Sequence, residues 1–177
     1  MSETASGVAL AHGIELSQTL TKRYFAGFDD SNRTKQAPGL PNHFAWQLGH
    51  LALTMHRVAE KLDGGSLPPS DFSPSDRGDA RCFGTESVSF GSKPSDSPAS
   101  YPGASRCVEV FDGSCVRLAR ALRAAGPDKL ARQHPWGATG ATSSVHDLAL
   151  RMLVHNGMHA GQLADLRRAL GMGSIFK

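Results

Sequence analysis

The sequence has few cysteines, little net charge and no long apolar run. Three of its 177 residues are cysteine (Cys82, Cys107 and Cys115), which is too few for a disulfide framework and indicates a reducing setting. No apolar run approaches the roughly 18 residues that a membrane span requires. The residues up to Gly7 lack the basic and apolar regions of a secretory signal. We therefore expect a cytoplasmic protein with no membrane partner.

The positive charge is also too small to suggest nucleic acid as a partner. The formal net charge is +3, and the basic residues are spread along the chain. The densest group (Arg117, Arg120 and Arg123) lies close in sequence to Glu109 and Asp112, which is typical of a solvated helix face rather than a phosphate-binding stripe. The charge pattern thus predicts no nucleic-acid partner.

The length and the hydrophobic periodicity favour one helical domain covering residues 1–177. Helical periodicity runs over about 4–28, 41–62, 102–125 and 143–170, and the last three stretches repeat apolar residues at steps of 4, 3, 4, 3 and 4. No stretch alternates as a surface strand does. We predict an all-α fold, an antiparallel four-helix bundle.

A long irregular loop is predicted between the second and third helices, over residues 63–100. Its sequence is crowded with Ser, Pro, Gly and Asp and carries no periodicity. Loops of this length in compact domains are usually functional or partly disordered. Phe83, Val88 and Phe90 are expected to anchor its middle to the core.

Two histidines stand where the last helix should carry leucines. His155 and His159 belong to an apolar series with Leu148, Met152 and Leu166, and they are one turn apart on the same side of the helix. That spacing allows two imidazoles to bind one metal ion. The alternative, equally weighted, is a pair of buried histidines that each bond to a polar neighbour.

A third ligand would have to come from another helix. The second helix offers His43, His50 and His56. His50 flanks the buried seam at Leu51, at the edge of the apolar face, whereas His43 in the first turn and His56 beside Arg57 are expected to be more exposed. The spacing alone leaves the choice among the three open.

The last helix also contains two interior glycines, Gly157 and Gly161. Each costs about 1 kcal/mol relative to alanine in a helix. Close approach of another helix is the usual compensation and is expected here. Asn156 and Gln162 are candidates to support the histidines, with simple helix packing as the alternative.

Three motifs of the sequence resemble those of the DinB/YfiT-like superfamily, whose members are small four-helix bundles. They are GHL with Trp46 upstream, HNGMHAGQL, and the ending RRALGMGSIF. The resemblance covers the chain from the second helix to the end. It implies a divalent metal ion bound by one histidine of the second helix and two of the fourth, which are His50, His155 and His159 here. Characterised relatives include thiol-dependent S-transferases and an isomerase that uses low-molecular-weight thiols.

Three neutral imidazoles leave an open position on a metal ion, which is the catalytic arrangement. The ion (Zn, Ni or Fe) would lower the pKa of a bound water or thiol. We therefore expect a metal-dependent enzyme, a thiol-dependent S-transferase or a hydrolase, that acts on a small-molecule substrate with a low-molecular-weight thiol as cosubstrate. No Asp or Glu lies in either motif, so no general base is assigned. The alternative is a non-catalytic scaffold or homodimer with a vestigial metal site.

Overall fold

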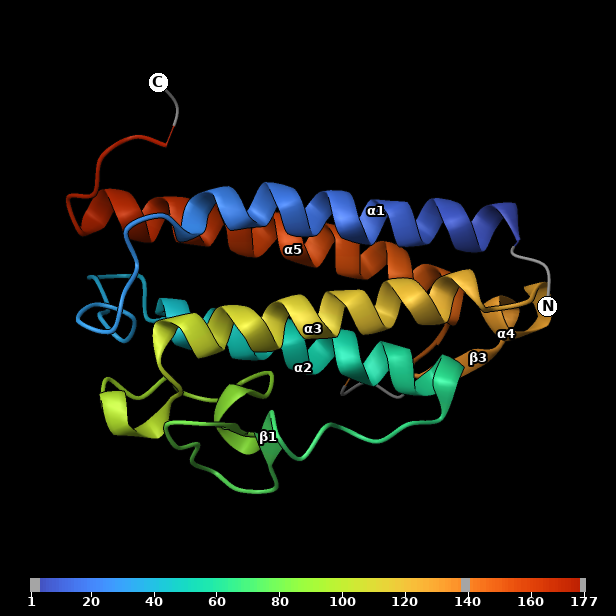
Figure 1. Ribbon diagram of the computed structural model, residues 1–177, viewed down its shortest axis with the longest axis horizontal. Helices are drawn as coiled ribbons and strands as arrows, with labels where there is room; N and C mark the ends of the chain where they lie inside the picture. Colours follow the sequence, from blue (N-terminus) through green and yellow to red (C-terminus); the bar gives the residue numbers. More distant parts are fainter. Residues whose placement is uncertain (1–3, 138–140, 176–177) are drawn as a thin grey trace.

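The computed structural model describes residues 4–137 and 141–175, and it is mainly helical (Figure 1). Helices make up 57% of the described residues, and the strands are short. The elements, in chain order, are α1 (Ala5–Lys22), the 3₁₀ helix η1 (Arg23–Phe25), α2 (Phe44–Asp63), β1 (Phe72–Ser73), β2 (Phe83–Gly84), the 3₁₀ helices η2 (Glu86–Val88) and η3 (Pro98–Ser100), α3 (Ala104–Arg123), α4 (Pro127–Ala131), β3 (Gln133–Pro135), β4 (Thr142–Ser144) and α5 (Val145–Ala169). The prediction of an all-α protein is confirmed.

Local capping residues explain where the long helices begin and end. The Thr4 hydroxyl accepts a hydrogen bond from the Gly7 amide at the start of α1, and the Ser144 hydroxyl accepts one from the Asp147 amide at the start of α5. Gly64 takes the left-handed conformation (φ 72°) directly after α2. Ser144 is therefore the N-cap of α5.

The four long helices lie alongside one another, with α3 and α5 each packed against both α1 and α2. Figure 1 shows α1 and α5 running in one direction and α2 and α3 in the other. The predicted antiparallel order thus holds for the pairs α1–α3 and α2–α5 and is wrong for α1–α5 and α2–α3. The reason is the long connection after α2, which returns along the helices so that α3 begins at the same end as α2.

That connection, residues 64–103, is more ordered than the sequence predicted. Phe72, Phe83, Val88 and Tyr101 are buried, and β1 pairs with β2 in parallel. The expected anchoring by Phe83 and Val88 is confirmed. Phe90 is 90% exposed, so its expected anchoring role is wrong; its side chain instead lines a surface cleft. The connection therefore covers α2 from outside.

The core combines the apolar faces of the long helices with Phe72, Phe83, Val88 and Tyr101 of the connection. On α3, the residues at the 4, 3, 4, 3, 4 spacing are buried except for Val108, which is partly buried; they are Ala104, Val108, Phe111, Cys115, Leu118 and Leu122. Cys107 and Cys115 are buried packing residues. No helix in residues 4–137 and 141–175 is long and apolar enough to cross a membrane.

On α2, side chains of the connection approach the backbone closely at Gly49, whereas the two glycines of the last helix that the sequence suggested are open. A Cβ atom on Gly49 would lie 2.7 Å from the Phe83 ring and 2.9 Å from the Val88 side chain. A Cβ atom on Gly157 or Gly161 would meet nothing within 4 Å, so the expected helix contact there is wrong. Gly49 is thus the position where the connection presses onto α2.

We predict opposite effects for two helical Gly→Ala substitutions. Gly113→Ala, on an open face of α3, should raise the free energy of unfolding by about 1 kcal/mol, because alanine has the better helix propensity. Gly49→Ala should lower it by about 1–3 kcal/mol, because Phe83 and Val88 must move. Chemical denaturation measures both, and equal stabilisation by the two substitutions would contradict the close contact at Gly49.

Candidate metal centre

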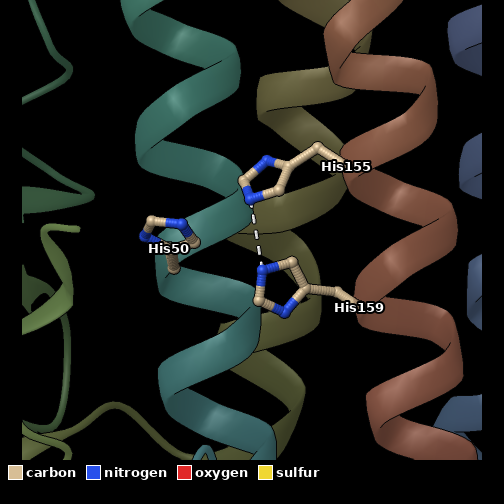
Figure 2. A group of neighbouring side chains, drawn as sticks. All are labelled: His50, His155 and His159. Atoms are coloured by element: carbon tan, nitrogen blue, oxygen red, sulfur yellow. Dashed lines mark hydrogen bonds between the residues drawn. The ribbon is translucent and has the colours of Figure 1, made fainter. Parts of the chain in front are cut away.

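The antiparallel pair α2–α5 brings His50, His155 and His159 together (Figure 2). Each offers one ring nitrogen, and these nitrogens lie within 4.8 Å of one another. The Nε2 atoms of His155 and His159 are 3.2 Å apart, the contact drawn as a dashed line in Figure 2. In the described part of the chain, these three histidines form the one group of at least three His, Cys, Asp or Glu side chains that lie close enough to share a metal ion.

The three histidines are shielded from solvent to different degrees. His50 and His159 are each 5% exposed, and His155 is half-buried at the edge of the site. His50 is therefore more buried than its edge position predicted. The inner face of α5 passes through Asn156, His159 and Leu163 rather than through His155 and Gln162.

Hydrogen bonds fix the tautomers of His50 and His159. The Val88 carbonyl can only accept, so His50 Nδ1 donates to it at 2.8 Å. Gln47 Nε2 donates to the Asn42 carbonyl at 2.7 Å, which turns Gln47 Oε1 toward His159 Nδ1 at 3.0 Å. Both Nδ1 atoms thus carry the proton, and both Nε2 atoms carry a lone pair.

His155 differs from the other two. The Thr54 hydroxyl lies 3.4 Å from His155 Nδ1, and it donates or accepts there according to which His155 nitrogen carries the proton; the same hydroxyl also reaches the His50 and Leu51 carbonyls at 3.0 and 2.9 Å. His50 and His159 therefore present Nε2 as the nitrogen that can bind a metal ion, and His155 does so when its proton is on Nδ1.

His155 Nε2 and His159 Nε2 are hydrogen-bonded to each other, so one proton lies between them. A metal ion bound to both nitrogens would take the place of that proton. Two imidazole nitrogens bound tetrahedrally to one zinc ion at 2.0–2.1 Å are about 3.3 Å apart, close to the 3.2 Å found between the Nε2 atoms. The donor set therefore fits a metal ion.

The Trp46 ring packs flat against the His50 ring. The two rings are stacked, with centroids 4.8 Å apart and planes within 10° of each other. The Trp46 indole N–H donates to the Ser92 hydroxyl in the connection. The tryptophan upstream of the GHL motif thus orients the imidazole of that motif.

Burial also keeps the three imidazoles uncharged. It lowers the pKa of His50, and it lowers the pKa of His155 to about 4 and of His159 to about 3, with smaller contributions from neighbouring positive charge. All three are therefore neutral at pH 7, which is the form that binds a metal ion.

His43 and His56 are buried, so the expectation that they are exposed is wrong. His43 caps α2: its Nδ1 accepts from the Trp46 amide, and its Nε2 donates to the Ser95 carbonyl. His56 Nδ1 accepts from Arg117 on the far side of α2. Residues of the connection cover both rings, and neither histidine faces the cluster.

The other polar residues of the last helix serve packing. Asn156 Nδ2 donates to the Ser17 hydroxyl of α1, and Gln162 Oε1 accepts from Asn42. Neither side chain hydrogen-bonds to His155 or His159 in the described structure, so the packing alternative is the one that the structure supports. Gln47 and Thr54 take the supporting roles instead, and spacing on their own helix did not single them out.

The histidine cluster opens into a surface cleft of about 1130 Å³ between α2 and α5. His50 and His155 form part of its wall, together with Leu53, Thr54 and Trp136. A small molecule in this cleft would have direct access to the open side of the cluster.

The chain belongs to the DinB superfamily. The model of this family matches residues 14–163, which include all three histidines of the cluster, and the match confirms the resemblance found in the motifs. No curated protein and no solved structure matched the chain.

The burial of His43 predicts acid-sensitive stability. Its pKa is lowered from 6.5 to about 4, first by burial, so the unfolded chain takes up a proton at a higher pH than the folded one. The contribution of this group is complete above pH 6.5 and is lost as the pH falls toward 4. A shift of this size corresponds to about 3 kcal/mol.

We test this with His43→Asn, which keeps a capping side chain and removes the titration. Denaturation of metal-free protein between pH 7 and pH 4 should show a shallower loss of stability in the variant. Identical pH profiles for the two proteins would contradict the assignment to His43.

Proposed function

We propose that the chain is a metal-dependent enzyme in which His50, His155 and His159 bind one divalent metal ion. The observation that carries the proposal is the convergence of one ring nitrogen from each of the three histidines within 4.8 Å. The Nδ1 atoms of His50 and His159 are held by acceptors, which leaves their Nε2 atoms for a shared ligand. Zinc, nickel and iron all suit imidazole ligands. When bound, such an ion supplies Lewis acidity and lowers the pKa of a bound water or thiol.

The reaction class we propose is thiol-dependent S-transfer, with hydrolysis as the related alternative. In both, the protein positions a small electrophilic substrate in the cleft beside the histidines. Glu60, the carboxylate among the described cleft residues, lies ten residues from His50 on α2, roughly 15 Å along the helix axis. We therefore assign no general base; a metal ion held by the three histidines would supply the Lewis acidity that activates a nucleophile.

The arrangement of the long helices supports a four-helix bundle of the DinB type, which we infer as the scaffold of the site. The pairs α1–α3, α1–α5, α2–α3 and α2–α5 are all in contact, so each helix has two neighbours around a common core. A homodimer remains a prediction that light scattering tests.

We predict one equivalent of metal in protein purified without chelator and after removal of any histidine tag. His50→Ala, His155→Ala and His159→Ala should each abolish tight binding, because two imidazoles hold such an ion weakly. Mass spectrometric metal analysis measures the content. His12→Ala, on the exposed face of α1, and His43→Asn are matched controls that should keep the metal.

Metal-binding wild-type protein should then be screened with electrophilic substrates and several low-molecular-weight thiols. Activity that disappears in His155→Ala supports the enzyme. Wild-type protein that retains its stability and never contains metal would favour the non-catalytic scaffold and would end the proposal.

Gln47→Leu should weaken metal binding by about 10- to 100-fold, because His159 Nδ1 loses its acceptor and the tautomer is no longer fixed. Gln47→Glu keeps an acceptor at that position and should restore most of the affinity. Competition with a chromophoric chelator measures the dissociation constants. Equal affinities for wild type and Gln47→Leu, with both folded by circular dichroism, would contradict the role given to Gln47.

A further inference from the structure

The cleft beside the histidines collects apolar side chains that folding has left exposed. The described residues include eight exposed large hydrophobic side chains: Val8, Leu16, Leu20, Phe90, Val116, Leu150, Val154 and Met158. Four of them line this one cleft, namely Phe90, Leu150, Val154 and Met158. Single exposed apolar residues are ordinary, whereas a group of them in a concave surface indicates a binding site.

Two arginines stand in the same cleft without partners. Arg57 and Arg151 are exposed, and neither guanidinium has a hydrogen-bond or ion-pair partner among the described residues. Lys61 lies over the Trp136 ring at 5.6 Å, and Glu60 is the carboxylate among the described lining residues. The cleft wall is therefore positively charged as well as apolar.

The arginines lie on one side of the histidine cluster. Arg57 follows His50 by seven residues on α2, and Arg151 precedes His155 by four residues on α5. Because α2 and α5 run in opposite directions, both steps lead toward the same end of the cleft. At 1.5 Å per residue, the arginines stand about 10 Å and about 6 Å from the histidines along the helix axes.

We propose that the cleft binds an amphipathic organic anion. A carboxylate, sulfonate or phosphate lies between Arg57 and Arg151, and an apolar body rests on Leu150 and Val154. The opposite end of the molecule, one to two helical turns away, reaches His50 and His155. Arginine recognises such groups through paired, charge-assisted hydrogen bonds. Only the placement of the reacting end beside His50 and His155 rests on the proposed function. The anion site and the apolar wall do not depend on it.

A matched pair of fluorescent probes tests the charge and the apolar body separately. The first is 8-anilinonaphthalene-1-sulfonate, and the second is N-phenyl-1-naphthylamine, which has the same ring system without the sulfonate. With the full-length, metal-loaded protein, Arg57→Gln/Arg151→Gln should weaken binding of the sulfonate at least about tenfold. The uncharged probe should bind as to wild type, and Arg120→Gln on α3 should change neither.

A second pair of substitutions tests the apolar wall of the cleft, with one valine inside the cleft and one outside it. Val154 is 64% exposed in the cleft, and Val116 is 62% exposed on α3 outside it. Val154→Ser should weaken both probes, and Val116→Ser should weaken neither. Added sodium chloride should weaken the sulfonate and leave the uncharged probe unchanged.

Metal content, measured on the same samples, separates this inference from the proposed function. Arginine-dependent probe binding that persists in metal-free His155→Ala supports the anion site even if the enzyme proposal fails. Metal-loaded protein in which Arg57→Gln/Arg151→Gln binds the sulfonate normally overturns the anion site alone. A dimer that Val154→Ser dissociates, with no probe bound to wild type, assigns the cleft to a second copy and also overturns it.

Discussion

The site depends on one constraint: a buried imidazole needs a partner for its N–H group. His50 and His159 satisfy that need through Nδ1, with a backbone carbonyl and an amide oxygen as acceptors. Their Nε2 lone pairs remain available, and His155 Nε2 lies 3.2 Å from His159 Nε2 in the same small volume. The hydrogen bonds around the cluster thus orient these nitrogens as ligands for a cation.

The connection between α2 and α3 contributes groups to the histidine site in addition to joining the two helices. It supplies the Val88 carbonyl to His50, the Ser92 hydroxyl to Trp46, and the Phe90 ring to the cleft. Gly49 has no side chain, which lets this segment press onto the turn of α2 that carries His50. The same length of chain allows α2 and α3 to run in the same direction.

The cysteines of the chain contribute no thiolate to the cleft. Burial raises the pKa of Cys107 and of Cys115 to about 12, so neither is a thiolate at neutral pH. Cys82, which also has a raised pKa, does not line the cleft. The histidines, the unpaired arginines and the apolar wall together describe a site for a small charged molecule.

Local signals in the sequence determined the helices and two of the three candidate metal ligands. Ser144 and Gly64 mark helix ends by their own hydrogen bonding and backbone freedom, and His155 and His159 share a face because the helix repeats every 3.6 residues. The choice of His50 came from the family motif, since spacing on α2 could not separate it from His43 and His56. The tertiary structure decided what covers α2: the connection buries His43 and His56 on its outer side, while α5 meets His50. Burial of that kind depends on contacts between distant residues, and the periodicity of a single helix carries no record of them.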